Sequence, residues 1–218
     1  GLSKSHAAGG YRLGYVIFPQ HAVDLKAQFK KILATEYTAV STPIQYAAIP
    51  GFEISHEMDN YFKITRNIHK IMGEYTYNTL TAIDGIKATK PEATFYLLAD
   101  FNAYSPELHK AKITTSQKLS EALIVHPYHT AIVGGDSLVL ERTDFSARIA
   151  YVDYDGAKVY DAYLAQTPKT HSERTEFVQN NAPKVVAGLT MIEKFFEALK
   201  RDAVDELMLM KNNLKIPN

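Results

Sequence analysis

The stretch from residue 56 to residue 80 constrains the fold most, because its apolar side chains recur at the spacing of an α-helix. A helix of ~25 residues is roughly 37 Å long at 1.5 Å per residue, which is enough to link two lobes of a protein. The apolar residues that fall largely on one face of this helix are Met58, Tyr61, Phe62, Ile68, Ile71, Met72 and Tyr75. The sequence therefore predicts a long helix that joins two parts of the chain.

Segments typical of strands and of helices alternate along the rest of the chain, and this alternation predicts an α/β fold. The Pro-Gly pair at 50–51 predicts a break in a helix that follows Thr42-Pro43, and the polar segment 166–181 is typical of a linker. The predicted strands are 13–18, 85–87, 94–99, 138–140 and 146–152, and the predicted helices are about 21–33, 44–54, 105–123, 157–164 and 184–210.

The composition argues against several classes of protein. The chain has 218 residues, 46% of them hydrophobic, and a formal net charge of zero, so nothing favours binding to nucleic acid or to an anionic membrane. No apolar run approaches the roughly 20 residues that span a bilayer. The N-terminus shows no signal-peptide pattern, and the absence of cysteine excludes disulfides and thiolate metal sites. We therefore expect a cytoplasmic protein without nucleic-acid or membrane partners.

A lysine stands in a small, glycine-rich segment at the N-terminus, and an arginine follows it eight positions later. A lysine amine that is partly desolvated beside other cations becomes a nucleophile toward a carbonyl carbon. An arginine guanidinium binds a phosphate through two parallel hydrogen bonds. Lys4 and Arg12 therefore suggest a Schiff base with a phosphorylated aldehyde cofactor. The hydroxyls of Ser3 and Ser5 could either donate hydrogen bonds to the phosphate or support the loop. The same spacing also fits a glycine-rich loop with two solvated cations.

Arg148 lies among apolar residues in the predicted strand 146–152. An arginine in such surroundings needs an anionic partner when it is buried, and a guanidinium binds a carboxylate through two parallel hydrogen bonds. The sequence leaves two interpretations open. Arg148 either binds the carboxylate of a substrate or forms a structural ion pair, for instance with Asp144 or Asp153.

No metal site is expected. His126 and His129 are three positions apart, but Pro127 argues against the helix that would bring them onto one metal ion. The segment 153–156 lacks the ligand spacing and the distal glutamate of a calcium loop. The motifs of nucleotide-binding P-loops, serine hydrolases and zinc proteases are also absent from the sequence.

The N-terminal segment resembles the cofactor-lysine segment of the fold-type I, class I/II aminotransferases, which use pyridoxal 5′-phosphate. In that family a Ser-Lys pair is followed by an arginine eight residues after the lysine, between glycines. Ser3, Lys4 and Arg12 occupy these positions, whereas Gly1 stands where many members have a serine that touches the phosphate. The residues that carry the resemblance are Gly1-Leu2-Ser3-Lys4-Ser5-His6 and Gly9-Gly10-Tyr11-Arg12-Leu13-Gly14-Tyr15, with Ala93-Thr94-Phe95-Tyr96-Leu97 further along.

This resemblance implies a transfer of an amino group between an amino acid and a 2-oxo acid. It implies that Lys4 carries the pyridoxal phosphate as a Schiff base and that Arg12 and Ser3 bind the cofactor's phosphate. It also implies that Arg148 binds the substrate carboxylate and that the protein is a homodimer.

The resemblance further implies the C-terminal part of the pyridoxal-phosphate transferase fold. Residues 1–55 would be the remnant of a large cofactor-binding domain, and residues 56–218 would form the interdomain helix and an α+β small domain. The chain opens inside a motif without a methionine, so we expect that a large N-terminal part is missing. In the family, that part holds the aspartate that pairs with the pyridine nitrogen, so we expect little or no transaminase activity from this chain alone.

Two other functions stay open at this point. A lyase of the same fold would use the same lysine and arginines, which do not determine the type of reaction. A non-catalytic interaction domain derived from this fold would need neither a cofactor nor the upstream part. An upstream sequence with an aspartate-bearing strand would favour an enzyme, and a natural start codon near Gly1 would favour the interaction domain.

Overall fold

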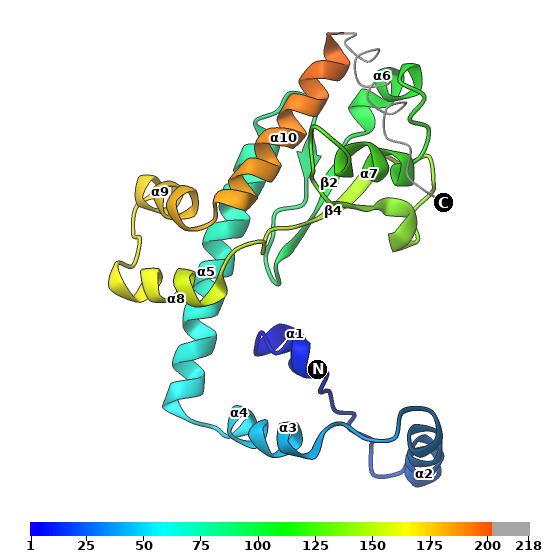
Figure 1. The fold of residues 1–218 in the computed structure, drawn as a ribbon, viewed down its shortest axis with the longest axis vertical. Helices are drawn as coiled ribbons and strands as arrows, with labels where there is room; N and C mark the ends of the chain where they lie inside the picture. Colours follow the sequence, from blue (N-terminus) through cyan, green and yellow to red (C-terminus); the bar gives the residue numbers. More distant parts are fainter. Residues whose placement is uncertain (202–218) are drawn as a thin grey trace. The chain divides into compact units, whose positions relative to one another are not determined.

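A computed structural model describes residues 1–201, and the chain divides into two compact units between Lys63 and Ile64 (Figure 1). The boundary falls inside helix α5, His56–Thr81, which confirms the long helix predicted from the apolar stripe. That residues 1–55 are the remnant of a larger domain stays a prediction.

Short helices build the first unit. They are α1 (Leu2–Ser5), the 3-10 helix η1 (Gly9–Tyr11), α2 (Val23–Ile32), the π-helical turn η2 (Leu33–Tyr37), α3 (Thr42–Ala47) and α4 (Ile49–Phe52). Helix α2 confirms the helix predicted near residues 21–33. The helix predicted after Thr42 is interrupted as expected, but the break falls at Ala48. Pro50 lies in the first turn of α4, where its missing N–H costs no helical hydrogen bond.

The strand predicted for residues 13–18 is wrong, because these residues form no strand. The side chains of Tyr15, Val16 and Ile17 are 59%, 63% and 81% exposed. A strand is stable only when a neighbouring strand pairs with its backbone, and the described first unit contains no other strand.

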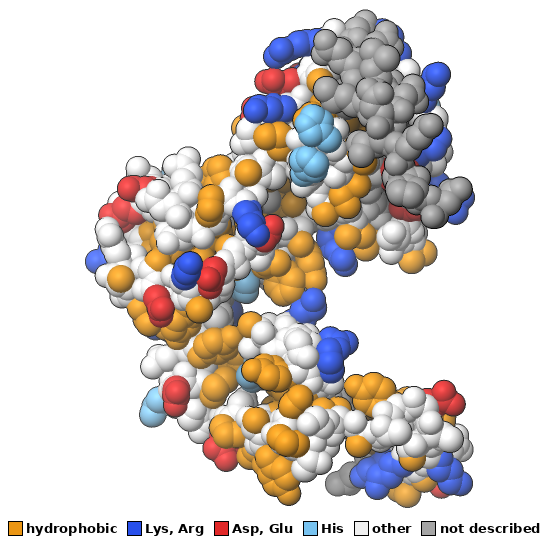
Figure 2. Space-filling view, viewed as in Figure 1, with side chains coloured by type: hydrophobic (Ala, Val, Ile, Leu, Met, Phe, Trp, Pro, Cys, Tyr) orange, Lys and Arg blue, Asp and Glu red, His pale blue; other side chains and the backbone are white. Residues whose placement is uncertain are grey.

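Apolar side chains lie exposed over much of the first unit, the part that carries α1 to α4 in Figure 1, and orange side chains spread over that part in Figure 2. Contiguous apolar surface on a protein is normally covered by another protein surface. The large exposed apolar residues outside segment 13–18 are Tyr11, Val23, Leu25, Phe29, Ile32, Leu33, Tyr37, Tyr46, Ile49, Phe52 and Ile54.

The second unit contains an antiparallel sheet with the strand order β1-β2-β4-β3. Its strands are β1 (Lys87–Ala88), β2 (Tyr96–Asp100), β3 (Val133–Gly134) and β4 (Ser146–Ala150). Strand β2 pairs with β4 from Tyr96 opposite Ala150 to Asp100 opposite Ser146. Side chains alternate between the two faces, so one face buries Leu97, Ala99, Ala147 and Ile149 in the core.

Asn102 fixes the register of this pairing just beyond β2. Its Oδ1 accepts a hydrogen bond from the Phe145 N–H at 2.9 Å, and its Nδ2 donates to Asp144 Oδ1 at 3.0 Å. The Phe101 N–H donates to the Phe145 carbonyl at 3.0 Å. Hydrogen bonds from the side chains of Ser146 and Asn102 hold the pKa of Asp144 below its ordinary value, so this carboxylate stays charged and keeps accepting.

The remaining helices of the described second unit follow along the chain. They are α6 (Ser105–Lys110), α7 (Ser116–Ile124), α8 (Gly156–Ala165), α9 (His171–Asn181) and α10 (Pro183–Lys200), with the 3-10 helices η3 (Asn102–Tyr104) and η4 (Gly135–Leu138). Helix α7 contacts β3 and β4, and α10 contacts α9 and α6 (Figure 1). The Phe196 ring of α10 lies 4.8 Å from Phe101 and 4.6 Å from Tyr104. None of the helices within residues 1–201 combines the length and the apolar character that a membrane crossing requires.

Two predicted elements of this unit need correction because of local backbone turns. The helix predicted for residues 105–123 is two helices, α6 and α7, and Lys112 between them has a left-handed φ of 60°. The strand predicted for residues 138–140 is wrong. Leu138 ends η4, and Val139 is left-handed with φ 65°, a conformation that a β-strand does not contain.

The C-terminal segments differ from the prediction in another way. The predicted linker, residues 166–181, is wrong over most of its length, because residues 171–181 form α9. The helix predicted for residues 184–210 is confirmed as far as Lys200, and its last nine positions, 202–210, lie outside the described residues.

Helix α9 begins with a capping box that explains why a polar segment is helical. Thr170 Oγ1 accepts a hydrogen bond from the Glu173 N–H at 3.2 Å, and Glu173 Oε2 accepts from the Thr170 N–H at 2.8 Å. Phe177 and Val178 are the buried residues of this helix. The cap and this small apolar contact together replace the long apolar stripe that sequence patterns detect.

The Thr170→Ala variant should lower the free energy of unfolding by about 1 kcal/mol, because it removes the capping side chain. Chemical denaturation with circular dichroism measures this change. Ser172→Ala is the matched control, since Ser172 is an exposed neighbour in the first turn of α9. Equal stabilities of the two variants would show that the cap does not hold α9.

A histidine and a tyrosine form a half-buried polar contact between α5 and the segment after β4. The Tyr154 hydroxyl lies 3.2 Å from His69 Nδ1, and the His69 ring lies 5.6 Å from the Phe95 ring. Burial lowers the pKa of His69 below its ordinary 6.5. Burial and the neighbouring Tyr151 raise the pKa of Tyr154 to about 12. Both groups are therefore neutral at pH 7.

This contact predicts a stability loss in mild acid. Below pH 6.5 the unfolded chain binds a proton that the folded His69 does not bind, so the free energy of unfolding falls as the pH falls from 6.5 toward the lowered pKa. Denaturation curves of wild type and of His69→Gln between pH 7.5 and roughly pH 5 measure this slope. The variant should lose part of the slope, whereas His171→Gln, at an exposed histidine, should keep it. If His69→Gln left the pH dependence of the free energy of unfolding unchanged, His69 would not be the group that causes it.

Candidate functional site

The segment around Lys4 folds back on itself into a closed loop. The Leu2 N–H donates to the Leu13 carbonyl at 3.2 Å, and the Ala8 N–H donates to the Leu2 carbonyl at 3.3 Å. Leu2 is the buried residue of α1, whereas Lys4, near the end of this helix, is exposed. The buried leucine and the two backbone bonds thus hold the loop, and the lysine side chain faces outward.

Arg12 belongs to the same closed loop. Its backbone is left-handed with φ 54°, and its Nη1 donates to the Gly9 carbonyl at 2.9 Å. One hydrogen bond leaves other N–H groups of the exposed guanidinium free to point at a ligand. Ser3 lies against Gly9, where a Cβ would come within 3.8 Å of the serine Cβ. The structure therefore brings Ser3, Lys4 and Arg12, which the sequence identified, onto one loop.

Arg148 lies on the less buried face of the sheet in the second unit. Strand β4 is paired on both sides, so Leu98 lies opposite Arg148 on β2 and Val133 lies opposite it on β3. Its guanidinium carbon stands 4.6 Å above the centre of the Tyr96 ring. The Nε atom of Arg148 is buried and has no hydrogen-bond partner among the described residues.

The alternative role of Arg148 as a structural ion-pair residue is not seen within the described chain. Asp144 accepts hydrogen bonds from Asn102 and from the Ser146 hydroxyl, the latter at 2.6 Å. Asp153 pairs with Lys184 at 3.4 Å. Both candidate carboxylates thus have other partners, and the buried Nε of Arg148 is left without one among residues 1–201.

Tyr96 is a candidate site residue that the sequence analysis did not identify as one. Its ring supports the guanidinium from below by a cation–π contact and thereby fixes the plane in which Arg148 can bind a carboxylate. Tyr96 lies two positions before Leu98, which pairs with Arg148, so a two-residue strand period would have placed it on the same face. The pairing register that makes this period useful is set by the tertiary structure.

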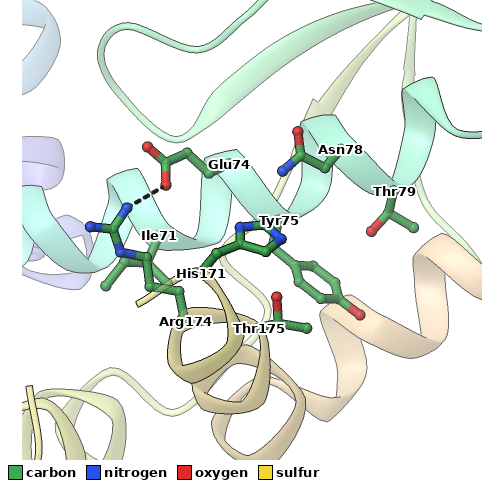
Figure 3. A pocket seen from close by; sticks show the side chains of 8 residues that line it. All are labelled: Ile71, Glu74, Tyr75, Asn78, Thr79, His171, Arg174 and Thr175. Atoms are coloured by element: carbon green, nitrogen blue, oxygen red, sulfur yellow. Dashed lines mark hydrogen bonds and ion pairs between the residues drawn. The ribbon is translucent and has the colours of Figure 1, made fainter. Parts of the chain in front are cut away.

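A cavity of about 220 Å³ opens between α5 and α9, and none of the predicted site residues lines it (Figure 3). Glu74 and Arg174 meet across it, with 3.1 Å between Oε2 and Nη1. This pair neutralises its own charge, so the cavity has no uncompensated ion with which to attract a charged ligand. The other residues that line it are Ile71, Tyr75, Asn78, Thr79, His171 and Thr175.

The two histidines considered as metal ligands lie close together without forming a cluster. The ring centres of His126 and His129 are 5.6 Å apart, and the rings are nearly perpendicular. Within residues 1–201, no three histidine, aspartate or glutamate side chains come together in a way that could hold a metal ion.

Sequence comparisons relate this chain to a known enzyme family. A sequence profile described as aminotransferase class I and II matches residues 1–159. The probable aspartate/prephenate aminotransferase of Aquifex aeolicus is 29% identical over 127 residues, which are 56% of this chain and 29% of that protein. The aspartate aminotransferase of Pinus pinaster is 26% identical over 153 residues, which are 69% of this chain and 30% of that protein. The chain therefore spans about three tenths of the length of these relatives.

Solved structures show the same relation in the fold. An alanine aminotransferase from Pyrococcus furiosus aligns with 90% of this chain and 41% of its own, with a TM-score of 0.58 and 21% identity. An aminotransferase from Escherichia coli aligns with 90% of this chain and 41% of its own, with a TM-score of 0.61 and 14% identity. The prediction of a partial α/β fold of the aminotransferase type is thus confirmed.

Replacing Arg148 by methionine should leave the free energy of unfolding within about 1 kcal/mol of wild type or raise it, because the variant removes an unpartnered buried donor. Loss of a buried structural ion pair would instead cost about 3–5 kcal/mol. Urea denaturation distinguishes the two outcomes. Arg201→Met, which breaks an exposed pair with Glu197, is the control for loss of a surface charge. A loss above about 3 kcal/mol in Arg148→Met would contradict a ligand-binding role.

Proposed function

Because this chain belongs to the class I and II aminotransferase family, we propose that it supplies a lysine and two arginines with which the whole protein transfers an amino group between an amino acid and a 2-oxo acid. The observation that carries this proposal is the closed loop from Leu2 to Leu13, which contains Lys4 and the exposed Arg12. Arg148, with its unpartnered Nε, supports it from the second unit.

The donors on this loop fit pyridoxal 5′-phosphate. A phosphorylated aldehyde needs an amine to bind the carbonyl carbon and fixed cationic or hydroxyl donors to bind the phosphate, and Lys4, Arg12 and Ser3 are groups of these kinds. Gly1 supplies no hydroxyl of its own to this set. When bound, the cofactor supplies an electron-withdrawing ring that stabilises negative charge at the substrate α-carbon.

Each of these residues has a distinct task. Lys4 Nζ holds the cofactor between reactions and, once free, moves the proton at the substrate α-carbon as a general base and acid. The Arg12 guanidinium binds the phosphate and so fixes the position of the cofactor relative to Lys4. The Gly9 carbonyl, which accepts from Arg12 Nη1, keeps that guanidinium on the loop.

Arg148 orients the substrate in this proposal. Amino acids and 2-oxo acids share an α-carboxylate, and two parallel hydrogen bonds from a guanidinium fix both its position and its plane. The Tyr96 ring below Arg148 and the paired strands on either side limit how far the guanidinium can tilt. A fixed carboxylate would in turn limit the orientation of the bonds at the substrate α-carbon.

The rest of the active site belongs to parts of the protein outside this sequence. The chain spans about three tenths of its relatives, and the exposed apolar surface of the first unit has the character of a surface that further protein covers. We propose that the upstream part of the same polypeptide and a second subunit cover it and complete the site in a cytoplasmic homodimer. The chain alone should then be inactive.

The two alternatives remain distinguishable from this proposal. A lyase of the same fold would use Lys4 and Arg148 as described but would release a fragment of the substrate instead of passing on its amino group. A non-catalytic domain would bind no cofactor at Lys4. The match to relatives that are named as aminotransferases favours amino-group transfer.

The central test uses the full-length protein with pyridoxal 5′-phosphate. Borohydride reduction followed by peptide mass spectrometry should place the cofactor on Lys4 in wild type, and Lys4→Ala should lose both this adduct and amino transfer, because no other amine on the loop can hold the carbonyl. Lys26→Ala, at an exposed lysine of α2, is the matched control and should keep both. A cofactor on another lysine would contradict the proposal, and turnover by residues 1–218 alone would contradict the need for an upstream part.

A further inference from the structure

His6 lies two positions after Lys4 and links the lysine loop to α4. Its Nε2 lies 2.8 Å from the Gly51 carbonyl, and its Nδ1 lies 2.8 Å from the Ser5 hydroxyl. A carbonyl oxygen can only accept, so Nε2 carries the proton and donates to Gly51. In the neutral imidazole Nδ1 then accepts from the hydroxyl of Ser5, the residue next to Lys4.

Two aromatic side chains of the same unit also pack against the imidazole ring. Its centre lies 5.2 Å from the Phe62 ring in an edge-on arrangement and 5.8 Å from the Phe52 ring. Tyr15, which follows the closed loop, packs edge-on against the same Phe52 at 5.1 Å. Two points of the loop region are therefore held by one aromatic group at the end of α4.

The position opposite the imidazole has little spare room. A Cβ on Gly51 would lie 3.3 Å from both Cδ2 and Nε2 of His6, a distance that would push the ring away. Gly51 thus permits the short approach that the hydrogen bond requires. The contact joins residues that are 45 positions apart in the sequence, so a local sequence pattern does not predict it.

We propose that His6 is a positioning residue that holds the Lys4 loop on α4 and so sets where the lysine amine stands. This inference rests on the proposed function of Lys4. The two hydrogen bonds of His6 restrain the backbone on the C-terminal side of Lys4, and the Leu2–Leu13 bond restrains it on the other side. With both restraints in place, the backbone of Lys4 stays in one position while its side chain moves. A nucleophile that is to reach its target atom accurately needs such a fixed backbone.

The test compares variants of the full-length protein, first without cofactor. His6→Phe keeps a ring for Phe52 and Phe62 but removes both hydrogen bonds, whereas His6→Gln keeps a donor for the Gly51 carbonyl. Hydrogen–deuterium exchange of the peptide containing residues 2–13 should rise by roughly fivefold or more in His6→Phe, and His6→Gln should restore part of the protection. His21→Phe, at an exposed histidine of the same unit, is the control and should change nothing.

The second measurement uses the same variants with pyridoxal 5′-phosphate. His6→Phe should lower kcat by roughly tenfold to a hundredfold with little change in KM, because a displaced lysine impairs proton movement more than substrate binding. Gly51→Ala should act in the same direction by crowding the imidazole. If His6→Phe destabilises the whole protein, His6→Gln and Gly51→Ala provide the comparison at matched melting temperature.

The outcomes separate this inference from the proposed function. Unchanged exchange of residues 2–13 in both His6→Phe and Gly51→Ala would overturn the positioning role. The positioning role would also be overturned if kcat fell only in step with the free energy of unfolding and His6→Gln recovered neither quantity. His6 would then have a merely structural role. Faster exchange in a protein whose Lys4 carries no cofactor would support the restraint by His6 and reject the proposed function instead.

Discussion

The pairing of β2 with β4 is the interaction on which the second unit depends. Strand β4 is paired on both edges, which fixes its register. Ala147 and Ile149 therefore point into the core, and Arg148 lies on the opposite face. A slip by one residue would bury the guanidinium and expose Ala147 and Ile149. The Asn102 side chain resists that slip because it joins Asp144 and Phe145, which directly precede β4.

The same pairing explains what Arg148 can do. A buried Nε without a partner is costly, and proteins retain such groups where a ligand compensates the cost. The Tyr96 ring restrains the guanidinium without neutralising its charge. Arg148 thus keeps a charged guanidinium with a restrained plane and one unpartnered, buried N–H donor.

Sequence patterns predicted the elements that carry long or regular apolar stripes. Helix α5, strands β2 and β4 and helix α8 were all predictable in this way, and Lys4, Arg12 and Arg148 were identified as candidates from residue type and resemblance. Helix α9 was missed because a capping box and two buried residues, rather than a stripe, stabilise it. Segment 13–18 has the composition of a strand but no neighbouring strand to pair with, and composition alone does not reveal this.

The candidate site was predictable only in part, for a related reason. Its charged residues could be identified individually, but the groups that hold them in place come from distant positions. Tyr96 reaches Arg148 through the register of the sheet, and His6 reaches Gly51 across 45 positions. Contacts of this kind depend on tertiary structure, which a single sequence does not display.

The most direct test of the whole account is a crystal structure of the full-length protein with pyridoxal 5′-phosphate and a carboxylate that resembles a substrate. We expect continuous electron density from Lys4 Nζ to the cofactor, phosphate oxygens within hydrogen-bond distance of the Arg12 guanidinium, and the carboxylate on Arg148. A cofactor held by another lysine, or a carboxylate bound away from Arg148, would contradict it.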